Sequence, residues 1–416
     1  MIPDIDSTCR FKNRRIVETL EDALVLLRFY SSSSFEENRL ADAAEQLRFI
    51  SENTLLRLLQ DPKVQMWSLV DLTPLTERTK SEEAIGLAEN LSEQINLIAL
   101  GIAHLERRSF RASIKHLPKD TFIPGVGISF DCAKGLEAVE IVSEADGTFK
   151  VNGSHIIEKR WLSTSGFTLP VDDPLLKPPT LEGYDLAILD SAQINQWEKL
   201  LARIHPLVKA SSRIDSLVSL FGSFILPLKA SSDGNHLSVS FKHLPGIIYA
   251  SWSQDDLEVL EAIVHEADHH CLFEIINENS LFTDDAVNLR AIFRSPWRKD
   301  PRPLSGLFFG LSAFVTVGVF LTELLNKELS KSDQTGNRAV LVLEQSLDAV
   351  SILSNIAVLT GRGKDLLEFN GMEAQKALEK LRSHSRFDSW QEESRERRTQ
   401  EASHWKQTHG GENIAA

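Results

Sequence analysis

The chain has 416 residues, 42% of them hydrophobic and 25% charged, which is the balance of a soluble globular protein with two or three domains. Its net charge of -14 argues against a nucleic-acid or anionic-membrane partner, because both need a basic surface. The three cysteines lack paired spacing and the N-terminus lacks an apolar signal segment, so we expect a cytoplasmic protein without a disulfide framework.

The first half of the chain divides into two regions by composition. Residues 1–118 show the apolar periodicity of helices, which predicts a helical N-terminal region. Residues 119–192 are richer in proline, glycine and β-formers, which predicts a β-rich region. Within it, Asp146-Gly147 separates two short β-prone runs, 136–143 and 148–151, as in a hairpin.

Residues 193–385 are predicted to form a further helical domain, and 386–416 a mobile polar tail. Helices are expected over 193–229, with breaks at Pro206 and Pro227, and two short strands over 237–240 and 247–250.

A long helix begins after those strands, where Ser253 is the expected N-cap. Residues 304–322 then carry no charged side chain and include Gly306 and Gly310. We favour a buried core helix over a membrane span, because serines, a threonine and glycines dilute the hydrophobicity of this segment. The glycines are expected to let it approach the preceding helix closely. The predicted fold class is α+β, predominantly α-helical, with the metal-motif helix packed on this buried glycine-containing helix and a smaller β-rich region.

The metal motif is His-Glu-Ala-Asp-His at residues 265–269. Two histidines four residues apart stand on one face of a helix, so His265 and His269 can hold one divalent metal, with Glu266 beside it. The pattern is short and matches by chance are common.

A zinc peptidase is the first interpretation, with Glu266 as the general base on a zinc-bound water. Three features weaken it. Ile275 stands where the extended motif has a third histidine, and the charged Asp268 lies inside the motif. The best candidate for a downstream glutamate ligand, Glu323, lies at the far end of the uncharged helix.

Iron(II) is the second interpretation. Non-haem iron oxygenases leave metal positions open for a 2-oxo acid and oxygen, and an arginine can hold the distal carboxylate of 2-oxoglutarate in a bidentate way. The segment RSPWRKDPRP, residues 294–303, supplies three arginines close to the motif helix. The alternative for this segment is a solvated basic loop.

The chain resembles the HExxH proteins of ribosomal peptide natural-product gene clusters, some of which are iron- and 2-oxoglutarate-dependent peptide β-hydroxylases. The resemblance covers residues 193–381. It rests on three blocks in order, which are HLPGIIYAS with SQDDLEVLEAIVHEADHH, then SPWRKDPRPLSGLFFGLSAF, then LTGRGKDLL. The middle block is more specific than the metal motif.

The resemblance implies that His265 and His269 are iron ligands and that Glu266 is an acid–base residue or supports the ligands. It makes Arg298 and Arg302 candidates for binding the co-substrate carboxylate, with Asp300 orienting one of them. Many relatives carry a histidine where this chain has Phe309. If that histidine is the third metal ligand, the replacement here is an extra water or one of three side chains, His270, Asp284 or Glu323.

The expected function is therefore an Fe(II)- and 2-oxoglutarate-dependent oxygenase that hydroxylates a β-carbon of a ribosomally synthesised precursor peptide. Two alternatives remain open. One is a zinc metallopeptidase that trims a leader peptide. The other is a non-catalytic peptide-binding scaffold, because Phe309 replaces a possible ligand.

Overall fold

The computed structural model describes residues 5–30, 34–76, 81–114, 121–130, 139–151, 159–160, 162–164, 166–170, 184–230, 236–278, 280–283, 293–330, 332–355 and 358–409. Its helices are α1 (Ile5–Tyr30), α2 (Ser34–Arg48), α3 (Glu52–Gln60), α4 (Pro62–Gln65), η1 (Met66–Leu69), α5 (Thr73–Thr76), α6 (Glu82–Leu105), α7 (Ser191–Lys209), α8 (Ser212–Phe221), α9 (Asp256–Glu278), α10 (Leu304–Asn326), α11 (Asp333–Ser354), α12 (Gly361–Leu381) and α13 (Phe387–His409). The predominantly α-helical α+β fold is thereby confirmed.

The strands form three small sheets. They are β1 (Phe110–Ile114), β2 (Thr121–Ile123), β3 (Ile128–Phe130), β4 (Val139–Ser143), β5 (Phe149–Val151), β6 (Lys159–Arg160), β7 (Leu162–Thr164), β8 (Phe167–Leu169), β9 (Phe224–Leu228), β10 (Ser238–Val239) and β11 (Ile247–Ser251). The sheet orders are β1-β4-β5, β2-β3-β6 and β10-β11-β9-β8-β7. In the largest sheet, β9 pairs in parallel with both β11 and β8.

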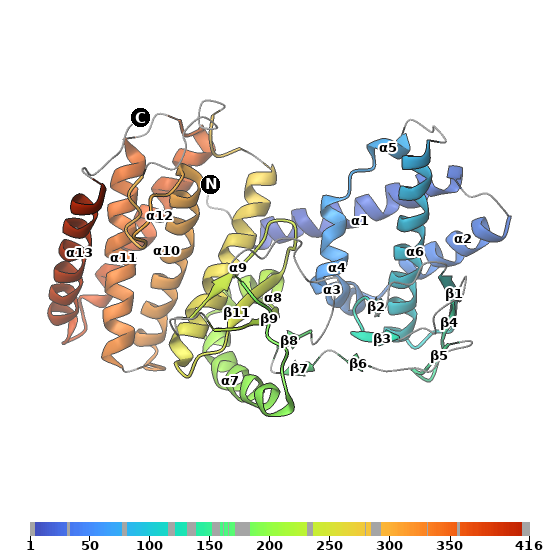
Figure 1. The fold of residues 1–416 in the computed structure, drawn as a ribbon, viewed down its shortest axis with the longest axis horizontal. Helices are drawn as coiled ribbons and strands as arrows, with labels where there is room; N and C mark the ends of the chain where they lie inside the picture. The colour runs from blue at the N-terminus through green and yellow to red at the C-terminus, as the bar shows by residue number, and fades with distance from the viewer. Residues whose placement is uncertain are drawn as a thin grey trace.

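Two large hydrophobic cores organise the described residues, as the two lobes of Figure 1 suggest. The first core is built by α1–α6 with β1–β5, and the second by α7–α12 with β8, β9, β11 and the start of α13. The β-rich region is therefore shared, because Phe149 of β5 belongs to the first core and Phe167 of β8 to the second.

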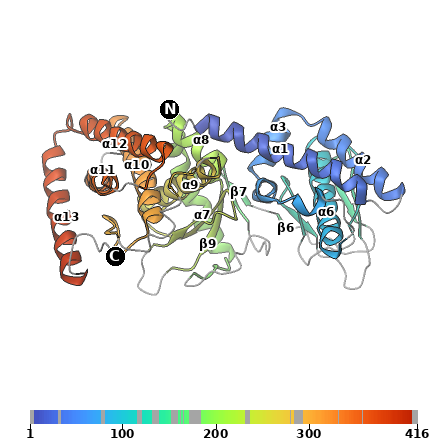
Figure 2. The ribbon, with the colours of Figure 1, turned by 90° about the horizontal axis from the view of Figure 1, so that it is seen from above.

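Helix α1 connects the two cores. It runs from α8 and α9 to the first core, where it packs on α6 and η1 (Figures 1 and 2). Arg15 of α1 lies 3.4 Å from Glu274 of α9, whose side chain is 4% exposed. A buried charge needs a nearby opposite charge, so this pair ties α1 to the motif helix.

The predicted hairpin is confirmed, and the two short strands expected over 237–240 and 247–250 are present as β10 and β11. Strands β4 and β5 pair antiparallel around the Asp146-Gly147 turn, where Gly147 has a φ of 83° that glycine adopts without strain. Strands β10 and β11 pair antiparallel as well.

Three local predictions are wrong. Helix α7 continues through Pro206 to Lys209, so the proline removes one i→i−4 hydrogen bond without ending the helix. Pro227 lies in the fully buried strand β9 and not at the end of a helix. The prediction failed because a short continuous apolar run is compatible with a buried strand as well as with a helix. Helix α9 begins at Asp256, and Asp255 rather than Ser253 accepts the cap hydrogen bond, from the Leu257 amide at 2.9 Å.

Helix α10 is the buried helix that the uncharged segment predicts. Among the described residues it is the one helix long and apolar enough to cross a membrane, and 67% of its most apolar window is buried within the protein. Its glycines do not serve the predicted close approach to α9. A Cβ at Gly310 would meet the Trp297 ring, and one at Gly318 would meet Leu343 of α11. The close contact on α9 is instead made by Gly222, whose Cβ would meet Ala267.

The C-terminal segment also differs from expectation, because residues 387–409 form helix α13 instead of a mobile tail. Phe387, Trp390, Ser394 and Trp405 are buried, while the rest of the helix is polar. Arg398 donates to Asp348 and Glu344 of α11 (2.7 and 2.9 Å), so this helix docks largely through polar groups. Hydrophobic periodicity alone could not indicate that mode of docking.

The contact between α11 and α13 yields a prediction about stability. A Cβ at Gly336 of α11 would overlap the buried Trp390 ring, so we expect Gly336→Ala to lower the free energy of unfolding by about 1–3 kcal/mol. Gly86→Ala in α6 is the control, because no atom lies within 4 Å of its added Cβ. That change should raise stability by about 0.5–1 kcal/mol. Urea titration of both variants measures the difference, and equal effects would contradict the packing argument.

Candidate functional site

The motif helix presents His265 and His269 on the same face, as their spacing predicts. Their ring centroids lie 4.5 Å apart, and both rings are half-buried. The His269 Nδ1 atom is buried without a hydrogen-bond partner among the described residues. The face therefore offers two imidazoles whose nitrogens are not all engaged by the protein.

Aromatic side chains of α10 cover this face. The Phe314 ring lies 4.6 Å from the His265 ring, and the Phe309 ring lies 5.6 Å from the His269 ring, centroid to centroid. Phe309 thus occupies a position from which a side chain reaches the histidine pair. The side chain at this position is an aromatic hydrocarbon, which cannot bind a metal as a donor.

The arginine-bearing loop lies beside the same face. Trp297 stacks on Phe314 with ring centroids 4.9 Å apart and an interplanar angle of 21°. Arg298 Nε donates to Asp300 Oδ1 at 3.0 Å. Arg302 Nε lies 3.0 Å from Asp300 Oδ2 but is not oriented to donate to it. The structure therefore brings the two motifs together, and Asp300 lies between the two arginines as the sequence suggested.

Arg338 of α11 is a member of this site that sequence reasoning missed. Its Nε donates to both carboxylate oxygens of Glu261, at 2.7 and 2.9 Å, and its guanidinium lies 5.7 Å from the Phe314 ring centroid. Glu261 stands one helical turn before His265, on the same face of the helix. This acidic residue was the one feature of the sequence that could have indicated a basic partner at the site. The cation itself comes from a helix more than 60 residues away in sequence.

The electrostatics of this face favour a neutral His265. Burial lowers the pKa of His265 well below its ordinary value, and the charge of His269 adds to the effect. Arg338 and Arg298 lower the same pKa further. The hydrogen bond and charge of Arg298, with a contribution from Arg302, hold the pKa of Asp300 below its ordinary value, although partial burial opposes them.

The two acidic residues inside the motif have other partners. The buried Glu266 carboxylate accepts hydrogen bonds from Ser238 Oγ at 2.8 Å and Ser240 Oγ at 2.7 Å. Asp268 is also buried and accepts a hydrogen bond from Thr316 of α10 at 2.7 Å. Its second oxygen, Oδ2, has no hydrogen-bond partner among the described residues. Glu266 thus holds the helix to the β10 edge and Asp268 holds it to α10.

A third metal ligand is not supplied by the residues that the structure describes, in which no three His, Cys, Asp or Glu side chains converge. His270 faces the opposite way, with Nε2 2.9 Å from the Ile247 carbonyl oxygen. Asp284 lies outside the described residues. Glu323 lies near the far end of α10. The described donor set is therefore two imidazoles.

Comparisons with known proteins give no family assignment. No family model matches the chain, and no curated protein matches it.

Proposed function

We propose that this protein is an Fe(II)- and 2-oxoglutarate-dependent oxygenase that hydroxylates a β-carbon of a ribosomally made precursor peptide. One observation carries the proposal. Two of the three sequence blocks on which the family resemblance rests lie side by side, because Phe314 of the middle block contacts His265 of the first block. Blocks that pack around one pair of histidines form a single candidate site.

The described residues fit an iron ion in part. His265 and His269 would hold it, and the lowered pKa of His265 keeps that imidazole in the neutral form that binds metals. The His269 Nδ1 atom is buried without a hydrogen-bond partner among the described residues, so it is the nitrogen of this imidazole that we expect to face a metal. With only two imidazoles and Phe309 opposite them, we expect the affinity for metal to be low.

The surrounding side chains have distinct proposed tasks. Arg298 and Arg302, held by Asp300, would bind a carboxylate of 2-oxoglutarate. Phe314 and Trp297 would exclude water from one side of the histidines. When bound, iron and 2-oxoglutarate supply the oxygen activation that hydroxylation of carbon needs.

The zinc-peptidase alternative receives less support from these contacts. Its general base would be Glu266, but both oxygens of this carboxylate accept hydrogen bonds from serine hydroxyls at the β10 edge. A carboxylate held in this way by Ser238 and Ser240 is best explained as a group that positions α9.

A non-catalytic peptide-binding scaffold is the second candidate function, and Phe309 is the observation that favours it. A phenyl ring beside His269 fills the place that a third ligand would take. In this case the arginines and aromatic rings would bind the precursor peptide itself, without turnover.

An anaerobic titration separates these candidates. We expect the protein loaded with Fe(II) to develop a visible charge-transfer band when 2-oxoglutarate is added, and we expect His269→Ala to lose it. The matched control is His243→Ala, which removes a histidine outside the site. Absence of the band at saturating Fe(II), together with retained binding of the precursor peptide, would reject the oxygenase in favour of the scaffold. Tight retention of zinc with a shortened peptide would favour the peptidase.

A further inference from the structure

A polar cavity lies between the arginine-bearing loop, α11 and α13. Its volume is about 450 Å³, which is within the usual range for ligand sites. Its lining residues come from three segments, the loop, α11 and α13. Those with charged side chains are Arg294, Asp348, Arg395, Arg398 and Lys406.

The lining is basic, with four cations and one carboxylate in a chain whose net charge is -14. Arg398 donates to Asp348 and Arg395 donates to Glu392. Arg294 is half-buried and has no ion-pair partner among the residues that the structure describes. A cation in that state is more stable when a ligand supplies an anionic group.

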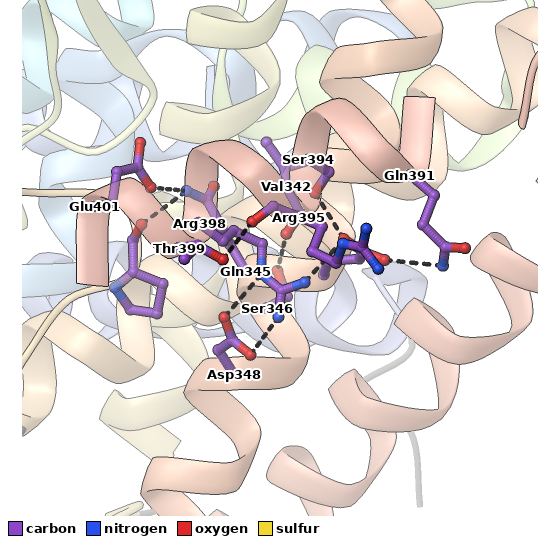
Figure 3. A network of polar contacts seen from close by, with 12 residues as sticks. Val342, Gln345, Ser346, Asp348, Gln391, Ser394, Arg395, Arg398, Thr399 and Glu401 are labelled. Carbon is purple, nitrogen blue, oxygen red and sulfur yellow. Dashed lines mark hydrogen bonds and ion pairs between the residues drawn. The ribbon is translucent and has the colours of Figure 1, made fainter. Parts of the chain in front are cut away.

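The wall of the cavity formed by α13 is held in place by the network drawn in Figure 3. Glu344 of α11 accepts from Ser394 at 2.6 Å and from Arg398 at 2.9 Å. Small side chains, Ala402 and Ser403 among them, line the space between the cations. The α13 side of the cavity is therefore held against α11 by partly buried hydrogen bonds.

The same network reaches the loop of the candidate site. Gln345 of α11 donates through Nε2 to the Pro296 carbonyl oxygen at 2.7 Å and to Glu401 of α13 at 3.0 Å. Arg294 precedes Arg298 by four residues, so their Cα atoms are at most about 14 Å apart. An extended peptide of about five residues covers the same distance, so a peptide lying along the loop would reach from Arg294 to Arg298.

We propose that the cavity between α11, α13 and Arg294 binds acidic side chains of the same peptide that the histidine site acts on. This inference rests on the proposed peptide substrate but not on iron chemistry, since a scaffold would use the cavity in the same way. The recognised group is a carboxylate within a peptide, and Arg294 is its main partner.

The test uses the full-length protein in EDTA, without 2-oxoglutarate, and fluorescently labelled hexaglutamate as the probe. We expect saturable binding by fluorescence anisotropy that weakens as salt is raised. Arg294→Gln should weaken it about tenfold or more, because a charge-assisted hydrogen bond is lost. Arg382→Gln, the same change at the end of α12, should leave the affinity unchanged.

A matched pair at Ser403 tests the location. Ser403→Asp introduces a carboxylate into the cavity lining and should abolish hexaglutamate binding, whereas Ser403→Asn, which has nearly the same size, should retain it. Absence of binding to the wild-type protein, or equal binding by Arg294→Gln, would overturn the proposal. Displacement of hexaglutamate by inorganic phosphate at the same concentration as the peptide would also overturn the proposal, since the cavity would then be a site for small anions. Because no metal is present, failure of the iron titration leaves this measurement interpretable.

Discussion

Phe309→His is expected to raise the affinity of the protein for Fe(II) by at least about 100-fold, or about 2.7 kcal/mol. The Phe309 ring faces His269 with centroids 5.6 Å apart, and His265 and His269 already share one face. An imidazole at this position would supply the third donor that the described residues lack. Anaerobic competition against a metal-binding dye measures the change.

Two controls distinguish a completed metal site from a general effect of polarity. Phe309→Gln removes the aromatic ring without adding an imidazole, so it should leave the affinity for Fe(II) close to that of the wild type. The double variant Phe309→His with His269→Ala should lose most of the gain. If Phe309→His binds Fe(II) no better than Phe309→Gln does, position 309 is not a ligand position.

Arg398→Met is expected to lower the free energy of unfolding by about 2–4 kcal/mol and to release α13. Arg398 donates to both oxygens of Asp348, at 3.0 and 2.7 Å, and to Glu344 at 2.9 Å. The Glu344 side chain is 11% exposed, so removing the cation leaves a nearly buried carboxylate with only neutral partners. Loss of one partner of a buried pair typically costs 3–5 kcal/mol, and the greater exposure of Asp348 reduces that figure to about 2–4 kcal/mol.

Arg395→Met is the matched control on the same helix. Arg395 pairs with Glu392 one turn away, and its side chain is 70% exposed, so its loss should change stability by less than about 0.5 kcal/mol. Urea unfolding measures both variants, and amide hydrogen exchange shows whether residues 387–409 lose protection. Equal losses in the two variants would show that the ion pairs of Arg398 do not hold α13.

The parts of the fold that sequence predicts are those with a local cause. The turn at Gly147 needs a positive φ, so the β4–β5 hairpin is evident from Asp146-Gly147 and its flanking β-formers. The uncharged run of α10 predicts a buried helix because no side chain in it needs water.

The parts that sequence does not predict depend on partners from elsewhere in the chain. Pro227 lies in a central strand because β9 is enclosed by the parallel strands β8 and β11, which no local pattern reveals. Helix α13 docks through Arg398 onto two acidic residues of α11, so its sequence resembles that of a solvated tail.

The candidate site follows the same division. The spacing of His265 and His269 is sufficient to predict that they share a face of the helix. In the structure their ring centroids lie 4.5 Å apart. The contact of Phe309 with His269, the position of Arg338 and the serine partners of Glu266 all come from the packing of separate elements. Those contacts change what the site is expected to do. Phe309 stands at the position considered for a third metal ligand, and the serines hold the carboxylate that would be the general base of a peptidase.

The position of α1 also bears on how the protein can be divided. Although α1 is encoded at the start of the chain, Arg15 pairs with Glu274 near the end of the motif helix. A fragment that begins after residue 190 would lack that partner, and its α8–α9 surface would be exposed to water. The minimal unit that keeps the histidine helix in its native surroundings therefore consists of two separate stretches of sequence. Recombination that exchanged only one half of the gene would separate α1 from the helix on which it packs.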